Sequence, residues 1–331
     1  MEKKILITGG AGYIGSFMTR RLKADGHHVI ILDNCINGHP EAVKDFRLEK
    51  IDLVTEKEKL HELFEHERFD AVIHMASFIQ MGESFTNPSK YYKNNVVGFL
   101  NLVDTMIANN CKKIILSSSA GVYGNPTRLP IEEDDLKNPL NPYGETKYIM
   151  ERILEDYDLA YGLKYIAFRY FNAAGAALDG SIGEAHLNES HLIPNIISKA
   201  LKGEEVVIFG NDYETVDGTC IRDYIHVLDL VESHALGLKV LEGGQKSNIY
   251  NIGIGKGYSN NEVIKMVEKI GNLNVNIKYG PRREGDANAL YASNAKIKND
   301  LGWSPKYDLD VIIDSALLWH KNHPNGYDNM D

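Results

Sequence analysis

Two residues in the middle of the chain have the types and the spacing needed to move a proton. Tyr143 and Lys147 stand four positions apart, which places both side chains on one face of a helix. A tyrosine becomes a base at neutral pH only if its pKa falls from about 10 to about 7, which requires roughly 4 kcal/mol of stabilisation of the phenolate. The Lys147 ammonium favours the phenolate. Because this spacing also occurs on solvated helix faces, further signals are needed.

A third candidate is Ser119, the last serine of a run at positions 117–119. The apolar run at 113–117 predicts a strand, so the serine lies where the strand ends. A hydroxyl at this point could bind a substrate oxygen and pass its proton to Tyr143. Serines are also common in ordinary turns.

A glycine-rich turn near the start of the chain predicts a binding site for a pyrophosphate. Gly9, Gly12 and Gly15 are spaced GxxGxxG, between an apolar run at 5–8 and a helical pattern at 14–25. Glycine permits a sharp turn and a close approach to phosphate, and the free N–H groups at the start of the helix face the anion. The alternative is an ordinary tight turn.

An acidic residue after the second predicted strand indicates which dinucleotide binds. Asp33 could accept hydrogen bonds from both hydroxyls of an adenosine ribose and would repel a 2′-phosphate, which favours NAD over NADP. The positive nicotinamide ring would then be a second cation near Tyr143. Asp52 follows another short apolar run, at 48–51, and could bind the adenine.

The elements that position these residues alternate between strand and helix. Such alternation predicts a Rossmann-type α/β fold, a doubly wound parallel sheet that binds ligands beyond the carboxyl ends of its strands. We expect strands at 5–8, 28–33, 71–75, 113–117 and 165–169, and helices at 14–25, 96–109 and 143–161.

The second half of the chain has a different residue pattern, which predicts a smaller C-terminal α/β substrate domain. A long loop at 172–187 is followed by expected helices at 191–201, 260–270 and 309–320 and by strands at 206–209 and 249–252. We therefore expect an NAD-binding Rossmann domain at 1–175, to which the chain returns around 220–250, and a substrate domain at 176–331. The polar tail at 322–331 is expected to fray.

Composition narrows the class of protein further. The 331 residues carry a formal net charge of −10, which disfavours binding to nucleic acid or to a membrane surface. Three cysteines without CxxC spacing, no signal peptide pattern and no long apolar run predict a soluble, cytoplasmic protein. The twelve histidines are scattered without metal-ligand spacing, so we expect no metal site.

Longer motifs give the chain a resemblance to a known family, the UDP-glucose 4-epimerases of the extended short-chain dehydrogenase/reductase superfamily. Motifs shared across the superfamily occur at 8–16, 31–34, 91–95, 117–124 and 169–172. The narrower signals lie in the second half, at 208–213 (IFGNDY), 217–219 (DGT), 222–227 (RDYIHV) and 281–286 (PRREGD).

The resemblance implies a reaction and its cofactor. Tightly bound NAD would take a hydride from C4 of a UDP-hexose and return it to the opposite face, through a transient 4-keto sugar. Ser119, Tyr143 and Lys147 would be catalytic, and the enzyme would act as a homodimer. The resemblance also implies residues that line the NAD site: Gly9, Gly12, Tyr13, Ile14, Gly15, Asp33, Asn34, Cys35, Ile36, Asn37, Gly38, Asp52, Leu53, Met75, Ala76, Asn94, Ser119, Tyr143, Lys147 and Phe171.

A second implied group would hold the UDP-sugar. Arginine forks match the oxygens of a diphosphate, and an aromatic side chain can pack near a uracil. For each arginine, a surface salt bridge is the alternative. The implied residues are Ser119, Tyr143, Asn172, His191, Leu192, Val207, Phe209, Arg222, Arg283, Asp286 and Leu290.

Four positions bear on what is specific to this chain. Ile79 stands where many members of the family carry a lysine, and Gly121 where a threonine is frequent, so one NAD contact and one sugar contact are in doubt. His191 replaces an asparagine of some members. The resemblance implies that the position of Leu290 helps to set the volume of the sugar pocket, and the intermediate size of leucine predicts activity mainly on UDP-glucose and UDP-galactose with some tolerance of N-acetyl sugars.

Other activities use the same scaffold. A 4,6-dehydratase needs an acid–base pair beside Ser119, but Ala120 and Gly121 follow it, which disfavours elimination. A 4-epimerase of UDP-glucuronate or of a UDP-pentose stays open. From a different class, a non-catalytic NAD-binding regulator would have no need for Ser119, Tyr143 and Lys147 together.

Overall fold

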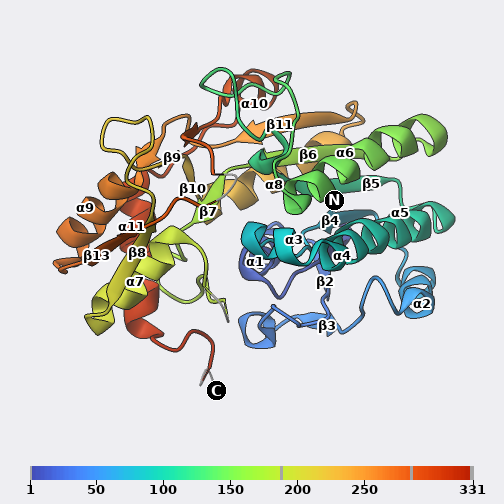
Figure 1. Ribbon diagram of the computed structural model, residues 1–331. Coiled ribbons are helices and arrows are strands. Elements are labelled where there is room, and N and C mark those ends of the chain that lie inside the picture. Colours follow the sequence, from blue (N-terminus) through green and yellow to red (C-terminus); the bar gives the residue numbers. More distant parts are fainter. Residues whose placement is uncertain (1, 187–188, 284–285, 329–331) are drawn as a thin grey trace. The chain divides into compact units, whose positions relative to one another are not determined.

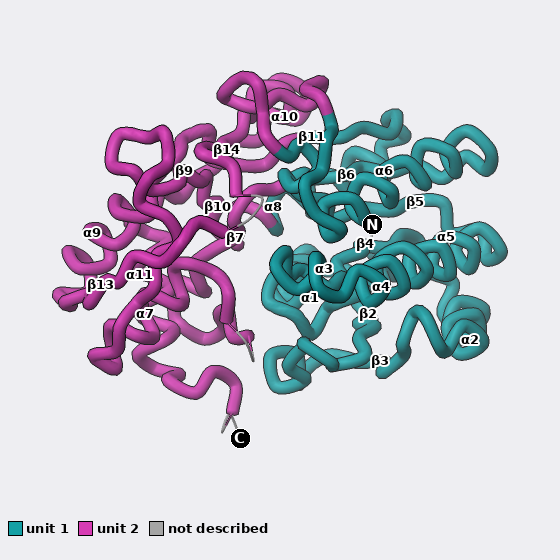
Figure 2. The backbone as a smooth tube through the Cα atoms, in the orientation of Figure 1, with its two compact units in different colours: residues 1–124, 137–169, 231–250 teal, residues 125–136, 170–230, 251–331 magenta. Residues whose placement is uncertain are grey.

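The computed structural model describes residues 2–186, 189–283 and 286–328. The end of the predicted loop at 187, two positions of the 281–286 motif and the last three residues of the tail lie outside the described residues. The chain forms two compact units, which Figure 2 shows in different colours. Unit 1 contains residues 1–124, 137–169 and 231–250, and unit 2 contains residues 125–136, 170–230 and 251–331.

The predicted Rossmann-type sheet is confirmed in unit 1. Seven strands are ordered β11-β6-β5-β4-β1-β2-β3, and the pairs β1–β2, β1–β4, β4–β5 and β2–β3 are parallel. The order reverses between β1 and β4, the switch point at which such sheets bind ligands. Its strands are β1 (Lys4–Thr8), β2 (His28–Leu32), β3 (Arg47–Glu49), β4 (Ala71–His74), β5 (Lys113–Ser119), β6 (Lys164–Tyr170) and β11 (Asn248–Ile252).

Helices cover the sheet because its strands are apolar on both faces. Ile5, Leu6 and Ile7 on β1 are fully buried, as expected for a central parallel strand. Helices α5 and α6 pack against each other (Figure 1). The helical elements before β7 are α1 (Tyr13–Ala24), η1 (Pro40–Val43), α2 (Lys57–Glu67), α3 (Met81–Thr86), α4 (Pro88–Tyr91), η2 (Tyr92–Val97), α5 (Gly98–Ala108), η3 (Ala120–Val122) and α6 (Pro142–Tyr161).

The helix that carries Tyr143 and Lys147 has clear start and stop signals in the sequence. The Asn141 side chain accepts a hydrogen bond of 2.8 Å from the Gly144 N–H, and Pro142 occupies the first turn, where it loses no helical bond. Gly162 ends the helix with φ +71°, a left-handed conformation that favours glycine. The start of α6 is therefore fixed just before the tyrosine.

Unit 2 contains smaller sheets around a separate apolar core. That core joins α7, α9 and α11 through residues such as Ile196, Val263 and Ile313. Strands β7 and β10 pair in parallel, β8 and β13 likewise, and β12, β9 and β14 form a third sheet. The elements are β7 (Asn172–Ala174), α7 (Leu192–Lys202), β8 (Glu205–Phe209), β9 (Ile221–Arg222), β10 (Tyr224–His226), β12 (Tyr258–Ser259), α9 (Asn260–Gly271), β13 (Asn276–Gly280), β14 (Ala289–Leu290), α10 (Ala295–Leu301) and α11 (Leu309–Asn322). Helix α8 (Val227–Glu242) begins in unit 2 and belongs to unit 1 from residue 231 onward.

Several local predictions need correction. The predicted loop at 172–187 begins with strand β7, because these residues pair with β10, a partner far away in sequence. Helix α7 begins at Leu192 rather than at His191, which has extended backbone angles and caps the helix. The strand expected at 48–51 lies at Arg47–Glu49. None of the described helices combines the length and the apolar character that crossing a bilayer requires.

Candidate active site

Ser119, Tyr143 and Lys147 come together in unit 1. Ser119 is the last residue of β5, and the other two lie in the first turns of α6. The Ser119 side chain hydrogen-bonds Tyr143 and accepts a bond of 3.0 Å from the Gly121 N–H. The Lys147 ammonium lies 5.9 Å from the centre of the Tyr143 ring. The sequence pattern therefore becomes one contiguous polar group at the carboxyl edge of the sheet.

Lys147 is held in place by two oxygen acceptors. Its Nζ donates to the Ser77 hydroxyl and to the Ser117 carbonyl, each at 2.8 Å. The side chain is 1% exposed, so its orientation is fixed by packing. Burial lowers the pKa of Lys147 to about 7, although Glu151 raises it. Sequence reasoning missed Ser77, because nothing in its local sequence separates it from a turn serine.

The expected fall in the pKa of Tyr143 is not produced by the described residues alone. Burial raises the pKa of Tyr143 above its ordinary value, and the hydrogen bond from Ser119 lowers it. The physical reason for the rise is desolvation, which disfavours the charged forms of both side chains in a buried site. The predicted phenolate depends on Lys147 together with the positive nicotinamide of bound NAD, and it stays a prediction.

A buried ion pair between Glu151 and Arg169 supports the group formed by Ser119, Tyr143 and Lys147. Arg169 donates to both Glu151 oxygens, at 2.9 and 2.6 Å, and to the Tyr123 hydroxyl at 2.8 Å. Ser118 donates to Glu151 at 2.5 Å. The ion-paired side chains are 3% and 1% exposed. Because Glu151 lies one turn after Lys147 on α6, the pair links the catalytic helix to β5 and β6.

We expect Glu151→Gln to lower the free energy of unfolding by about 3 kcal/mol, because it leaves the Arg169 charge buried without a counter-charge. Urea unfolding followed by circular dichroism would measure this. Glu155→Gln is the matched control on the same helix: Glu155 pairs with Arg152 at 2.7 Å, but their side chains are 37% and 57% exposed. The control should cost less than about 1 kcal/mol. Equal losses in the two variants would contradict the prediction.

The glycine turn forms a cradle that only glycine fits. A Cβ on Gly15 would lie 2.2 Å from the Gly9 carbonyl oxygen, and one on Gly9 would lie 2.5 Å from the Ala76 nitrogen. Gly9 also has φ +73°. Gly12 caps α1, whose first N–H groups have no side-chain cap. An uncapped helix start on a close-packed glycine turn fits a pyrophosphate.

Asp33 lies at the end of β2 beside this turn. One of its carboxylate oxygens accepts from the Ala11 N–H at 3.0 Å and the other from the Cys35 N–H at 2.8 Å. Burial raises the pKa of Asp33, and these two N–H groups lower it. The carboxylate thus fixes the loop that follows. Cys35 in that loop has φ +58°, in the left-handed region.

The other residues expected at the NAD site belong to unit 1, with one exception. Asn34 Nδ2 donates to Asp52 at 2.8 Å, which brings these two predicted contacts together. Met75 and Ala76 follow β4 directly. Phe171 belongs to unit 2. The remaining positions are Tyr13 and Ile14 at the start of α1, Ile36, Asn37 and Gly38 in the loop after β2, Leu53 after Asp52, and Asn94 in η2.

Asn95 is a positioning residue that sequence reasoning missed. It is fully buried in η2, a π-helix, and its Nδ2 donates to Thr146 Oγ1 at 3.0 Å. Its Oδ1 accepts from the Phe78 N–H at 2.9 Å. These bonds tie the segment after β4 to the catalytic helix. The YYKNN motif could have drawn attention to Asn95. The local sequence does not show that its side chain turns inward, because the widened turn of the π-helix depends on contacts with distant segments.

The departures from the family pattern have local consequences. Ile79 is 38% exposed, and its aliphatic side chain brings no charge to this position. A Cβ on Gly121 would lie 3.3 Å from Ser119 Oγ and 3.8 Å from Tyr143 Cε1. A threonine at this position would therefore contact both catalytic candidates, and glycine leaves that space open.

In unit 2, several residues expected to bind the UDP-sugar gather around the backbone of Asp223. Asn172 donates to the Asp223 carbonyl, and the Asp223 N–H donates to the Leu290 carbonyl at 3.0 Å. Arg222 pairs with Leu290 in the sheet and reaches Asp286 at 3.3 Å. The buried Asp223 carboxylate accepts N–H bonds from Ile254, Gly255 and Ala292, which gives it a structural role.

A second group lies at the ends of β8 and β13. The Arg283 guanidinium stacks over the Phe209 ring, 4.0 Å from its centre. One face of this ring is therefore covered by the guanidinium. Val207 lies on the same strand. His191 is the N-cap of α7, and Leu192 is its first residue.

A doubly wound sheet with a glycine cradle at its switch point, and with serine, tyrosine and lysine converging at a neighbouring strand end, defines an enzyme of the short-chain dehydrogenase/reductase type. The model of the NAD dependent epimerase/dehydratase family matches residues 5–253. The chain belongs to this family.

Individual relatives are similar over the whole length. A UDP-glucose 4-epimerase of Lactobacillus helveticus is 44% identical over 328 residues, or 98% of this chain and 99% of that protein. The solved UDP-glucose 4-epimerase from Bifidobacterium longum in complex with NAD+ and UDP is 37% identical with a TM-score of 0.92, covering 98% and 99% of the two chains. The UDP-Glc/GlcNAc 4-epimerase from Campylobacter jejuni is 39% identical with a TM-score of 0.83, covering 97% and 99%. The resemblance seen in the motifs is thus confirmed.

Proposed function

We propose that this protein is an NAD-dependent UDP-glucose 4-epimerase that interconverts UDP-galactose and UDP-glucose. The observation that carries the proposal is the contact between Ser119 and Tyr143 with Lys147 beside them, in a chain similar to UDP-glucose 4-epimerases from end to end. A regulator that only senses NAD would not need this group. The reaction inverts one carbon and leaves no net change of oxidation state.

The chain's own residues move the proton. Tyr143 takes the proton of the C4 hydroxyl, directly or through Ser119, and later returns one to the other epimer. Lys147 holds its ammonium beside the tyrosine through the bonds to Ser77 and Ser117, so the geometry needs no rearrangement during the reaction. NAD, when bound, would supply a reversible acceptor for the C4 hydride and a positive charge that favours the Tyr143 phenolate.

Unit 1 is suited to hold the cofactor. The cradle of Gly9, Gly12 and Gly15 would receive the pyrophosphate at the start of α1, and Asp33 would receive the adenosine ribose. The two N–H groups that already hold the Asp33 carboxylate orient it for that contact. We assign the NAD-binding domain to this unit, together with the other cofactor residues named above except Phe171, which belongs to unit 2.

Unit 2 would hold the UDP-sugar. Arg222 and Arg283 provide guanidinium groups for the diphosphate, Phe209 an aromatic face for the uracil and Asp286 an acceptor for ribose hydroxyls. Asn172, His191, Leu192, Val207 and Leu290 complete the proposed substrate site. We also propose a cytoplasmic homodimer that binds neither nucleic acid nor membranes.

The direct test is to incubate the NAD-loaded protein with UDP-galactose and to follow UDP-glucose by chromatography. With deuterium at C4 of the substrate, we expect the label to stay on C4 of the product and no free NADH to accumulate. Loss of the label to solvent would overturn the proposal. UDP-galacturonate and UDP-arabinose in parallel assays test the uronate and pentose alternatives.

The size of Leu290 should limit activity on N-acetylated sugars. We expect kcat/KM to be higher for UDP-galactose than for UDP-N-acetylgalactosamine, and Leu290→Tyr to lower the second value by about tenfold or more while the first changes by less than about threefold. Leu136→Tyr is the control, since Leu136 is 75% exposed. Equal efficiency on both sugars in the wild-type enzyme would refute the preference.

A further inference from the structure

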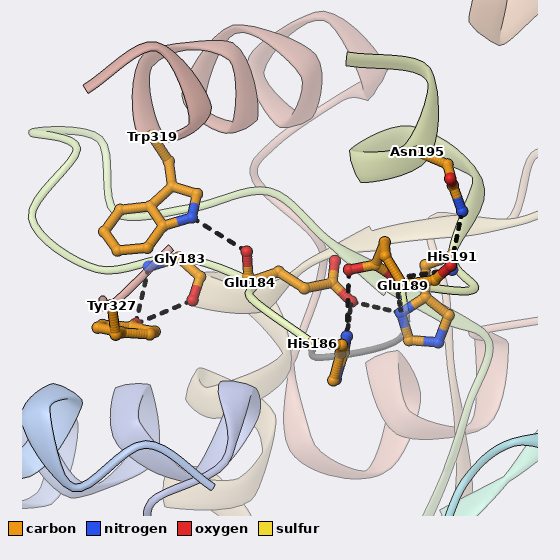
Figure 3. A network of polar contacts seen from close by, with 8 residues as sticks. All are labelled: Gly183, Glu184, His186, Glu189, His191, Asn195, Trp319 and Tyr327. Atoms are coloured by element: carbon orange, nitrogen blue, oxygen red, sulfur yellow. Dashed lines mark hydrogen bonds and ion pairs between the residues drawn. The ribbon is translucent and has the colours of Figure 1, made fainter. Parts of the chain in front are cut away.

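Two different polar networks hold the proposed substrate residues of unit 2. His191 belongs to the first network: its Nδ1 binds Glu184, whose carbonyl accepts from Trp319 Nε1 at 3.0 Å (Figure 3). The second network surrounds Asp223, a fully buried residue between β9 and β10. It reaches three of the proposed substrate residues, so it bears on more of the proposed substrate site than the first.

The peptide groups of Asp223 hold residues on either side of it. Its N–H donates to the Leu290 carbonyl at 3.0 Å, which continues the parallel pairing of Arg222 with Leu290 in β9 and β14. Its carbonyl accepts from the Asn172 N–H at 3.0 Å and from Asn172 Nδ2 at 2.9 Å. The second of these bonds fixes the plane of the Asn172 amide. The backbone of Asp223 thus sets the spacing between three residues that we propose to bind the UDP-sugar.

The carboxylate of Asp223 holds two further segments of unit 2. Oδ1 accepts from the Ile254 N–H at 2.9 Å, and Oδ2 accepts from the N–H groups of Gly255 and Ala292 at 3.2 and 3.1 Å. A Cβ on Gly253 would lie 2.4 Å from Oδ2, so the carboxylate packs directly against that backbone. All three donors are peptide N–H groups, which move only if the chain itself moves. These three bonds, the Asp223 clamp, join the segment after β11 to the segment after β14.

The clamp depends on the chemistry of a carboxylate. An ionised carboxylate accepts through both oxygens and forms stronger bonds than a neutral acceptor. Asparagine would have a single acceptor oxygen, and its NH₂ group would face at least one of the N–H donors. Burial raises the pKa of Asp223 to about 6, although the three N–H bonds lower it, so the carboxylate is ionised at pH 8.

We propose that Asp223 is a positioning residue for substrate binding: the Asp223 clamp keeps Asn172, Arg222 and Leu290 in the arrangement that receives the UDP-sugar. This role rests on the proposed function and adds a residue to it. Because Asp223 is fully buried, it acts through its neighbours rather than by contact with the ligand. Errors of about 1 Å in groups that orient a substrate can cost about 100-fold in rate, so a preformed arrangement matters.

The test is the binding of UDP to the full-length, NAD-loaded protein at pH 8, measured by isothermal titration calorimetry. We expect Asp223→Asn to raise the Kd for UDP by about tenfold or more and to raise the KM for UDP-galactose in proportion. The value of kcat should change by less than about threefold, because the UDP portion is held equally in the ground state and in the transition state.

Asp229→Asn is the matched control, because Asp229 is also a buried carboxylate that accepts from peptide N–H groups. It is 2% exposed, and its Oδ2 accepts from Lys306 and Tyr307 at 2.9 and 3.0 Å. Neither partner is a proposed substrate residue. The control should lower the free energy of unfolding by a similar amount but keep the wild-type Kd and KM. Equal weakening of UDP binding in both variants would reflect a general loosening of unit 2 and would overturn the proposal.

Gly253→Ala is a second variant, which leaves the carboxylate chemically intact. Its Cβ would push Asp223 Oδ2 away from the N–H groups that it binds. We expect the Kd for UDP to rise by about threefold or more. If Asp223→Asn does not fold, this variant decides. A wild-type Kd in Gly253→Ala, or in a folded Asp223→Asn protein, would contradict the role of the clamp.

Amide hydrogen exchange of the wild-type protein gives a reading without any variant. Because the clamp exists before the ligand arrives, peptides that contain 253–255 and 291–293 should exchange slowly, and UDP should alter their rates by less than about threefold. Exchange that slows by about tenfold or more only after UDP binds would overturn the proposal. Wild-type protein that neither binds UDP nor epimerises UDP-galactose would overturn the proposed function together with this role.

Discussion

Tyr143→Phe is expected to lower the turnover of UDP-galactose by about 10²–10⁴-fold. The substitution removes only the hydroxyl that hydrogen-bonds Ser119, while the ring keeps its packing beside Lys147. Because the side chain is buried and the hydroxyl is the proposed base, no neighbouring group described at this point of unit 1 replaces its function. NAD content and the free energy of unfolding should stay close to those of the wild type.

Tyr148→Phe is the matched control for this variant. Tyr148 lies on the same helix, one residue after Lys147, and is partly exposed. The turnover of the Tyr148→Phe variant should differ from that of the wild type by less than about threefold. If Tyr143→Phe kept full turnover, the proposed proton transfer would be wrong. If neither variant nor the wild type epimerised any UDP-sugar while NAD stayed bound, the result would favour a non-catalytic NAD-binding regulator.

The sequence predicted the sheet of unit 1 well because its signals are local. A strand buried on both faces needs a continuous apolar run, and 5–8, 71–75 and 113–117 all contain one. The glycine spacing and the capping residues around α6 act within a few positions of the chain. These features fix where Tyr143, Lys147 and Ser119 lie along their elements, so the parallel topology brings them to one edge.

What the sequence did not predict depends on contacts between distant segments. Strand β7 exists because β10 pairs with it, and the inward turn of Asn95 depends on Phe78 and Thr146. The pKa of Tyr143 rises because burial is decided by the whole fold rather than by the YxxxK spacing. Local pattern identifies the chemical groups, whereas their protonation requires the three-dimensional surroundings.

Gly15→Ala is expected to abolish the retention of NAD, with affinity lowered by about 100-fold or more. The new Cβ would lie 2.2 Å from the Gly9 carbonyl oxygen and 2.6 Å from the Gly10 Cα. Both are backbone atoms, so the turn itself must open, and the N–H groups at the start of α1 would lose their alignment toward the pyrophosphate. Overpacking of this kind also costs about 1–3 kcal/mol of stability.

Chromatography of the cofactor released from denatured, purified protein measures this effect directly. Gly82→Ala is the matched control: a Cβ there meets no atom within 4 Å, and alanine favours the helix α3 in which it lies. The control should retain wild-type NAD, and a Gly15→Ala protein that also retained it would show that the glycine turn is only a packing feature. That result would contradict pyrophosphate binding by the glycine turn, but it would leave the catalytic role of Tyr143 untouched. The two predictions are independent because the glycine turn is proposed to bind the pyrophosphate and Tyr143 is proposed to act beside the nicotinamide.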